Sequence, residues 1–317
     1  MIWFKAQYIL NTISPVFLVI ILGAILRLSG FFKDEITDAL SKLTYWVALP
    51  VLLFHSIASS QYGFGDALQV FYAVAAGMAV AIAVSAAICI FFKIDRSSAG
   101  AFIQGAFRGN LIFIGLPLVV YSFASRSQGG IDKLQETAIL TLSLAIPMYN
   151  IVTIVILLIC KHSIDIKTPF KIVKELLSNP LVIASACGIL YCHYFNNIPV
   201  VVGRSCEIIG LMALPLALLS IGASIVGTKN AANYPLAFTS SLIKVALCPF
   251  AGFFIARRLG LSSDQTQIAL LFLACPTAVS SYIMASQMGS NARLAAAIVV
   301  VSSVLSVAAI VAVLILI

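Results

Sequence analysis

The chain has 317 residues, of which 62% are hydrophobic and 9% are charged, whereas an ordinary soluble domain is about a quarter charged. The net charge of +8 is scattered over short segments without a basic stripe or interleaved aromatic residues, which excludes nucleic acid as a partner. The composition therefore predicts an all-α polytopic membrane protein in contact with the lipid bilayer. Ten spans of about 20 residues need roughly 200 apolar residues, and 62% of 317 residues is about 197.

Uncharged stretches locate the expected spans, because a charge near the bilayer centre is energetically expensive. Eight long stretches carry no charge, and two more are interrupted once, the fourth by Arg108 and the eighth by Lys244. In chain order the ten expected transmembrane helices lie between residues 5 and 27, 42 and 66, 66 and 93, 96 and 126, 136 and 161, 175 and 204, 207 and 229, 229 and 257, 264 and 293, and 293 and 317.

The distribution of basic residues between the two membrane faces predicts the orientation. In this arrangement the face that holds both termini carries six Lys and Arg residues, and the opposite face carries eleven. Because cytoplasmic loops are enriched in Lys and Arg, we expect both termini on the non-cytoplasmic side of the plasma (cell inner) membrane. Arg257 and Arg258 are the one pair that disagrees with this orientation.

An internal repeat becomes visible when the chain is shifted against itself by 165 residues. The matches are Pro15 with Pro180, Gly23 with Gly188, the Ala-Leu-Pro triplet at 48–50 with that at 213–215, and the Ser pair at 97–98 with that at 262–263. Five helices per half is an odd number, so the second half enters the membrane from the opposite side, which is typical of transporters. We therefore expect a first five-helix repeat over 1–163, a cytoplasmic linker over 164–179 and a second, inverted repeat over 180–317.

Helix-breaking and polar residues gather in the middle of the fourth and ninth expected spans. The fourth contains Gly109, Asn110, Gly115 and Pro117, and the ninth contains Pro276, Thr277, Ser280 and Ser281. Such breaks free backbone groups and are tolerated in a bilayer only where protein or water satisfies them, so they often mark a binding site. Half-helices whose N-termini converge supply unpaired N–H groups and positive dipole ends, a ready site for an anion. Of these residues we expect Asn110, Gly115, Pro117 and the four named residues of the ninth span to bind it.

The chain resembles the auxin efflux carrier family of membrane transport proteins. The resemblance covers the whole chain and is carried by residues 107–119, 48–50, 244–249 and 274–285. It implies transport of an organic anion through crossed, broken helices 4 and 9, in a fold of the bile acid/arsenite/riboflavin transporter superfamily. Asn110, Gly115 and Pro117 match the family's fourth-span break, and Pro276 matches the ninth-span break. The chain lacks the long cytoplasmic loop of the plant members and a second asparagine beside the ninth-span proline.

Three further polar residues lie inside expected spans. Arg108 has two interpretations: a counter-charge for an anionic substrate, or a structural strut paired with a freed carbonyl group. Lys244 is expected to brace the crossed helices, with a role in coupling as the alternative. Asn150 in the fifth span is expected to line the cavity, since a buried amide needs a partner.

Three candidates concern coupling and helix shape. His55 is either a proton carrier, since histidine is the side chain best suited to exchanging protons in the physiological pH range, or a packing residue. Pro50 and Pro215 are expected to kink their helices and thereby shape the cavity. All eleven acidic residues lie in loops or at span edges, so a carboxylate that binds a coupling ion within the membrane is not expected. Coupling to Na+ or H+, or uniport, therefore stays open.

These features together predict a secondary transporter that moves a small organic anion, such as a dicarboxylate or an auxin-like acid, by alternating access. The alternatives are an anion channel and a sodium-coupled symporter of a bile-acid-like or other organic solute. An enzyme is not expected, because HExxH, GxSxG and paired carboxylates at span depth are missing from the sequence. No metal site or cofactor is expected either. Small residues in the third span allow the close packing of helices within the chain or in a homodimer.

Overall fold

The computed structural model describes residues 15, 18–59, 65–124, 133–161, 170, 173–174, 177–195, 198–226 and 233–316. Within these ranges every regular element is helical, which confirms the predicted all-helical class. Most of the expected linker lies outside the described residues, which leave out 164–169, 171–172 and 175–176.

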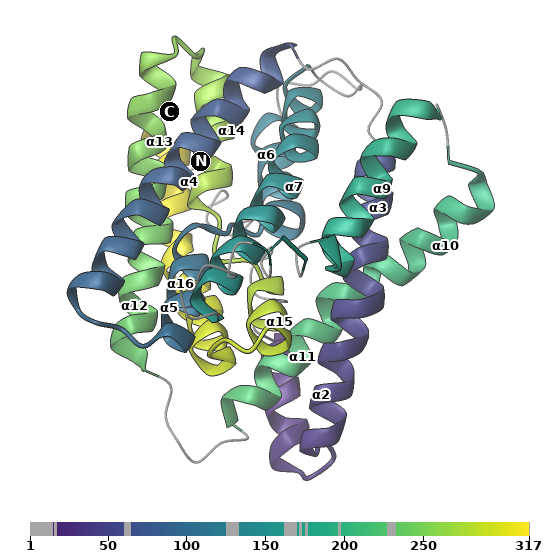
Figure 1. Ribbon diagram of the computed structural model, residues 1–317. Helices are drawn as coiled ribbons and strands as arrows, with labels where there is room; N and C mark the ends of the chain where they lie inside the picture. The colour runs from purple at the N-terminus through teal and green to yellow at the C-terminus, as the bar shows by residue number, and fades with distance from the viewer. Residues whose placement is uncertain are drawn as a thin grey trace.

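The helices form two groups that lie side by side (Figure 1). The group that we call the panel bundle comprises a helix over Leu18–Leu28, α2 (Asp34–Leu43), η1 (Thr44–Ala48), α3 (Leu49–Ala58), α9 (Pro180–Tyr194), α10 (Val200–Leu211) and α11 (Ala213–Val226). The group that we call the crossing bundle comprises α4 (Gly65–Phe91), α5 (Arg96–Phe107), η2 (Leu111–Gly115), α6 (Leu116–Ala124), α7 (Lys133–Lys161), α12 (Tyr234–Leu242), η3 (Ile243–Leu247), α13 (Cys248–Arg258), α14 (Ser263–Ala274), α15 (Ser280–Gln287) and α16 (Ala292–Leu316).

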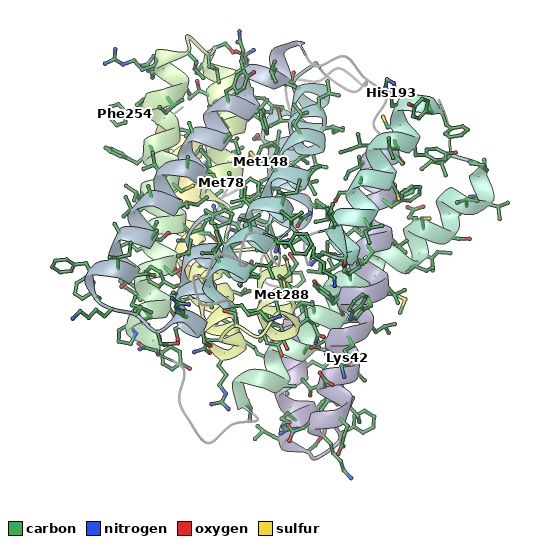
Figure 2. The ribbon with its side chains drawn as sticks, in the orientation of Figure 1. Lys42, Met78, Met148, His193, Phe254 and Met288 are labelled. Atoms are coloured by element: carbon green, nitrogen blue, oxygen red, sulfur yellow. The ribbon has the colours of Figure 1, made fainter. Side chains whose placement is uncertain are left out.

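Six helical segments in the described part of the chain are long and apolar enough to cross a membrane. They are Asp34–His55, Ala67–Phe91, Thr137–Lys161, Val200–Ala223, Tyr234–Arg258 and Ala292–Ile315. Large apolar side chains are exposed on their outer surfaces. One of them is Phe254, which projects from the edge of the crossing bundle (Figure 2). The protein is therefore a multi-pass membrane protein.

Three helices contain a wide, π-type turn directly before a proline. The turns η1, η2 and η3 end one residue before the Leu-Pro or Cys-Pro pairs at 49–50, 116–117 and 248–249. In each case the residue before the proline donates its N–H to the carbonyl oxygen five residues earlier. A proline ring clashes with the carbonyl of the preceding turn and cannot donate, so the wider turn makes room for it. Pro50 thus lies at a helix irregularity, and Pro215 lies in the first turn of α11, just after the junction with α10.

Glycines bring the Leu18–Leu28 helix into backbone contact with α11. A β-carbon on Gly222 would overlap the carbonyl oxygen of Ile20, and one on Gly23 would overlap that of Leu219. The two helices therefore approach more closely than any larger side chain permits, as small residues allow in membranes.

Replacing Gly222 with Ala is expected to lower the free energy of unfolding by about 1–3 kcal/mol, because the two backbones must separate. Thermal unfolding of the purified protein measures this loss. Gly203→Ala on α10 is the matched control, since the nearest atoms to its β-carbon would be 3.6 and 3.8 Å away. Equal unfolding midpoints for the two variants would refute the close approach.

The centre of the crossing bundle is formed by α5 and α14, whose residues are buried from Ser98 to Phe107 and from Thr266 to Ala274. Both helices begin at a side-chain cap: the Asp95 carboxylate accepts from the Ser98 N–H at 2.9 Å, and Ser262 forms a capping box with Gln265. These caps satisfy N–H groups that a helix start leaves unpaired. The caps thereby set where α5 and α14 begin.

Candidate functional site

The two interrupted helices meet where α5 and α14 end. Gly109 and Thr277 form an isolated antiparallel bridge. The Asn110 N–H donates to the Pro276 carbonyl at 2.8 Å, and the Ala278 N–H donates to the Arg108 carbonyl at 2.9 Å. Each break thus satisfies backbone groups of the other, which is how an extended segment is tolerated at membrane depth. The bridge holds residues 108–110 and 276–278 side by side, and we call these two segments the crossing.

A buried cation lies at the carboxyl end of each helix that leads into the crossing. Arg108 follows the last residue of α5, and the ammonium group of Lys244 donates to the carbonyl oxygen of Leu273 in the last turn of α14. Arg108 is 5% exposed and Lys244 is 0% exposed. Because the carboxyl end of a helix carries a partial negative charge, both positions favour a cation.

Neutral groups surround the guanidinium of Arg108. It donates through one nitrogen to the Asn150 amide oxygen at 2.6 Å and through the other to the sulfur of Met284. No ion pair joins Arg108 to a carboxylate in the part of the chain that the structure describes. The acidic side chains whose exposure is described lie at the surface: Asp34, Glu35, Asp38, Asp95 and Glu207 are exposed, and Asp264 is half-buried. Counted over the described residues, the crossing therefore carries net positive charge.

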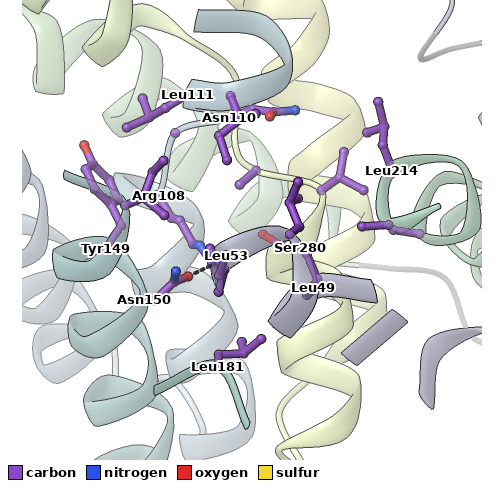
Figure 3. A pocket seen from close by; sticks show the side chains of 18 residues that line it. Leu49, Leu53, Arg108, Asn110, Leu111, Tyr149, Asn150, Leu181, Leu214 and Ser280 are labelled. Atoms are coloured by element: carbon purple, nitrogen blue, oxygen red, sulfur yellow. Dashed lines mark hydrogen bonds between the residues drawn. The ribbon is translucent and has the colours of Figure 1, made fainter. Parts of the chain in front are cut away.

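A cavity of about 70 Å3 lies between the crossing and the panel bundle. This is room for several water-sized groups, since one water needs about 10–15 Å3 on the same measure. Its polar wall comes from residues 108–112, 149–150 and 278–280, and its apolar wall comes from α3, α9 and α11. Figure 3 shows the Arg108 side chain reaching to Asn150, with Ser280 and the apolar side chains of Leu49, Leu53 and Leu181 nearby.

Several buried polar atoms around this cavity have no hydrogen-bond partner among the described residues. They include the amide nitrogens of Asn110 and Asn150 and the hydroxyl group of Tyr149. Burying such a group unpaired costs about 1–3 kcal/mol. All three residues line the cavity, and the Asn150 amide contacts the guanidinium, so a ligand or water placed there would find a further donor beside Arg108.

Four of the residues predicted from sequence line the cavity: Arg108, Asn110, Asn150 and Ser280. Others support the crossing instead. Pro276 supplies the carbonyl that accepts from Asn110, and the Thr277 hydroxyl donates to the Gly105 carbonyl at 2.7 Å.

Three more predicted residues lie beside the crossing and do not line the cavity. The buried hydroxyl of Ser281 has no hydrogen-bond partner in the described part of the chain, and the Ser281 carbonyl accepts from Gln104 at 3.0 Å. A β-carbon on Gly115 would come within 3.0 Å of the Phe272 ring, so this glycine lets η2 pack on α14. Pro117 lies in the first turn of α6.

The remaining candidates do not line the cavity. His55 is half-buried on α3 and faces α10, where its ring lies 3.8 Å from the position of a β-carbon on Gly203. The ammonium of Lys244 is engaged at the end of α14. Pro50 and Pro215 lie in α3 and α11, the helices that form part of the apolar wall.

Sequence reasoning missed the apolar wall and two neighbours of the arginine. Leu49, Leu53 and Leu181 line the cavity, yet leucines are ordinary in any span and carry no distinguishing pattern. Met284, which contacts Arg108, likewise carries no distinguishing pattern in the sequence. Tyr149 had a usable signal, because it is adjacent to the intramembrane Asn150.

Comparison with known families assigns the chain to one of them. The family model described as "Membrane transport protein" matches residues 8–315, which is nearly the whole chain. A search of curated proteins found no match. Among the described residues no group of three or more His, Cys, Asp or Glu side chains is placed to hold a metal ion.

Proposed function

The chain belongs to the membrane transport protein family, and from that premise we propose that it is a secondary carrier for a small organic anion. A carboxylate, such as a dicarboxylate or an auxin-like acid, fits the proposal. The observation that carries it is the buried guanidinium of Arg108, which faces the cavity with only neutral partners among the described residues. A carboxylate would give this charge its counterion and accept from the amide nitrogen of Asn150, which has no partner among the described residues.

The energetics favour an anion over a neutral or cationic solute. A charge taken out of water loses several kcal/mol of solvation unless a partner restores it. Within the membrane such a group is a functional candidate whose partner has to be identified. The protein itself supplies an amide oxygen and a thioether to Arg108. An anion that enters the cavity therefore gains more from Arg108 than it would from a fully paired arginine.

Alternating access is proposed because the cavity lies between two bundles that each supply one wall. The panel bundle touches the crossing bundle through α7 with α9 and α3 in one place. In another it does so through α15 with α2, η1 and α11 and through α16 with α11. If the crossing bundle moves against the panel, one set of these contacts opens while the other closes. The bound anion would then be exposed to the two membrane faces in turn.

Ten spans arranged as an inverted 5+5 repeat remain part of the proposal. The six long spans, the shorter apolar helices Leu18–Leu28 and Pro180–Tyr194, and the broken pairs α5–α6 and α14–α15 add up to ten. The glycine contacts support the repeat. Gly23 of the first half packs on Leu219 of the second, and Gly188 of the second packs on Phe54 of the first. Both the glycines and their partners are 165 residues apart, as expected if the halves exchange contacts across a pseudo-twofold axis.

A sodium-coupled symporter is the second candidate, and two buried oxygens favour it. The side-chain oxygens of Gln104 and Ser281 have no partner among the described residues, and both lie beside the ninth-span break. Oxygen atoms of this kind are the ligands that hard cations prefer. Coupling would appear as sodium-dependent binding of the anion.

The test is ligand-dependent thermal stabilisation of the purified protein with a panel of mono- and dicarboxylates and indole acids, with and without sodium. A ligand at 100 times its dissociation constant is expected to raise the free energy of unfolding by about 2.7 kcal/mol. Counterflow of the same acid in liposomes then separates a carrier from a channel, because a channel shows no counterflow. If every organic anion fails to stabilise the protein, the anion proposal is wrong.

A further inference from the structure

A second cavity lies on the outer side of the crossing bundle, and it shares no lining residue with the first. It is a groove of about 690 Å3 between the α12–α13 segment and α16, with Leu270 of α14 at its floor. Phe250 and Phe253 form one wall, and Ala309 and Ala312 form the other. Every side chain that lines the groove is apolar.

The groove exists because one membrane span changes its packing partner halfway along. The α12 helix and η3 pack on α16, whereas α13 packs on α4 and α14 instead. The change follows the wide turn η3 and Pro249, both of which bend helices. Small residues on α16 leave the opened space unfilled. The groove lies within the spans Tyr234–Arg258 and Ala292–Ile315, so the medium beside it is the hydrocarbon of the bilayer.

The length of the groove matches one leaflet. Its lining runs from Leu242 to Phe254, and twelve residues of helix rise about 18 Å at 1.5 Å per residue. Half of a hydrocarbon core about 30 Å thick is about 15 Å. A single acyl chain lying along the groove would therefore extend from mid-membrane to the interface.

Two arginines stand at the interfacial end of the groove. Arg257 lies over the ring of Phe253, with its guanidinium carbon 5.5 Å from the ring centroid, and Phe253 lines the groove. Arg258 is the neighbouring residue, and both arginines are exposed. In the described part of the chain neither forms an ion pair with a carboxylate. This is also the basic pair that disagreed with the orientation expected from the other loops.

We propose that the groove binds an anionic phospholipid, with one acyl chain between α13 and α16 and the phosphate group at Arg257 and Arg258. An apolar groove alone accepts any lipid tail, but two exposed guanidinium groups at its mouth, without a carboxylate partner among the described residues, select for negative charge. The proposal is independent of the transported solute. It also explains why Arg257 and Arg258 disagree with the expected orientation, since these arginines bind a lipid headgroup and do not set the orientation in the membrane.

Native mass spectrometry of the purified protein with added dioleoylphosphatidylglycerol or dioleoylphosphatidylcholine tests the site. We expect the anionic lipid to bind at least about tenfold more tightly, because each basic residue near a membrane surface contributes appreciably to anionic lipid binding. The double variant Arg257→Gln, Arg258→Gln should bind both lipids equally. Arg204→Gln, an exposed arginine on α10, is the control and should keep the preference.

A groove-filling variant tests the acyl chain separately from the headgroup. Ala312 is exposed in the groove, so Ala312→Phe fills the space without displacing core atoms and should reduce retention of both lipids. Equal binding of the two lipids by the unmodified protein would overturn the proposal. So would an unchanged preference in the double arginine variant, or a dimer without lipid that Ala312→Phe dissociates, since a second copy would then be the occupant.

Discussion

Replacing Arg108 with Gln is expected to weaken binding of the transported anion by about 30- to 100-fold, with a much smaller change in the midpoint of thermal unfolding. A hydrogen bond to a charged group contributes about 1.5–3 kcal/mol, and the anion would lose its counter-charge as well. The protein loses the hydrogen bond from Arg108 to Asn150, because a Gln side chain is shorter, but it also loses a buried charge whose partners are neutral, so the two effects offset each other. Ligand-dependent stabilisation gives the affinity, and unfolding without ligand gives the stability.

Two further variants separate charge from position at this site. Arg108→Lys keeps the charge but loses the planar, two-pronged donor, so it should bind the anion with intermediate affinity. Arg204→Gln removes an exposed charge far from the cavity and should leave binding unchanged. If Arg108→Gln unfolds much more readily while its folded fraction keeps full affinity, Arg108 is a structural strut, and the anion site has to be sought elsewhere.

Asn110→Ala is expected to reduce transport at least about tenfold while folding stays close to normal. The side-chain nitrogen of Asn110 has no partner among the described residues, so little internal bonding is lost. Its backbone N–H, which holds the crossing through the Pro276 carbonyl, is kept in alanine. Removing a donor that only the ligand uses should act on binding and transport, as truncation of a ligand-facing hydrogen bond does. Initial rates of uptake into liposomes measure the effect.

Asn179→Ala is the control, because it should affect folding more than transport. The Asn179 side chain caps α9 by accepting from the Leu181 N–H at 3.0 Å and donates to the Tyr45 hydroxyl at 2.7 Å. Loss of a cap typically lowers stability by about 1 kcal/mol. This variant should therefore unfold at a lower temperature than Asn110→Ala, yet its initial rate of uptake should be higher. Unchanged uptake by Asn110→Ala would remove the crossing from the substrate path.

The amino-acid sequence by itself determined that the protein lies in a bilayer, that its regular structure is helical and which family it belongs to. A chain with 62% hydrophobic and 9% charged residues belongs in a bilayer, and within the described ranges its regular structure is helical. The family resemblance, confirmed by the match over residues 8–315, rested on proline, glycine and asparagine. These residues carry information because each breaks a helix or leaves a polar group in hydrocarbon. For the same reason Arg108, Asn110 and Asn150 stood out, and all three line the cavity.

Only the tertiary structure decided which side chains share a site. The break around Thr277 places its hydroxyl on the Gly105 carbonyl and leaves Ser280 in the cavity, a difference that spacing does not predict. The partners of Arg108 come from α7 and α15, 42 and 176 residues away in sequence. The leucine wall and the outer groove depend on where helices diverge. Apolar residues are interchangeable in sequence, because lipid and protein offer them equally apolar surroundings, so the packing geometry alone assigns their contacts.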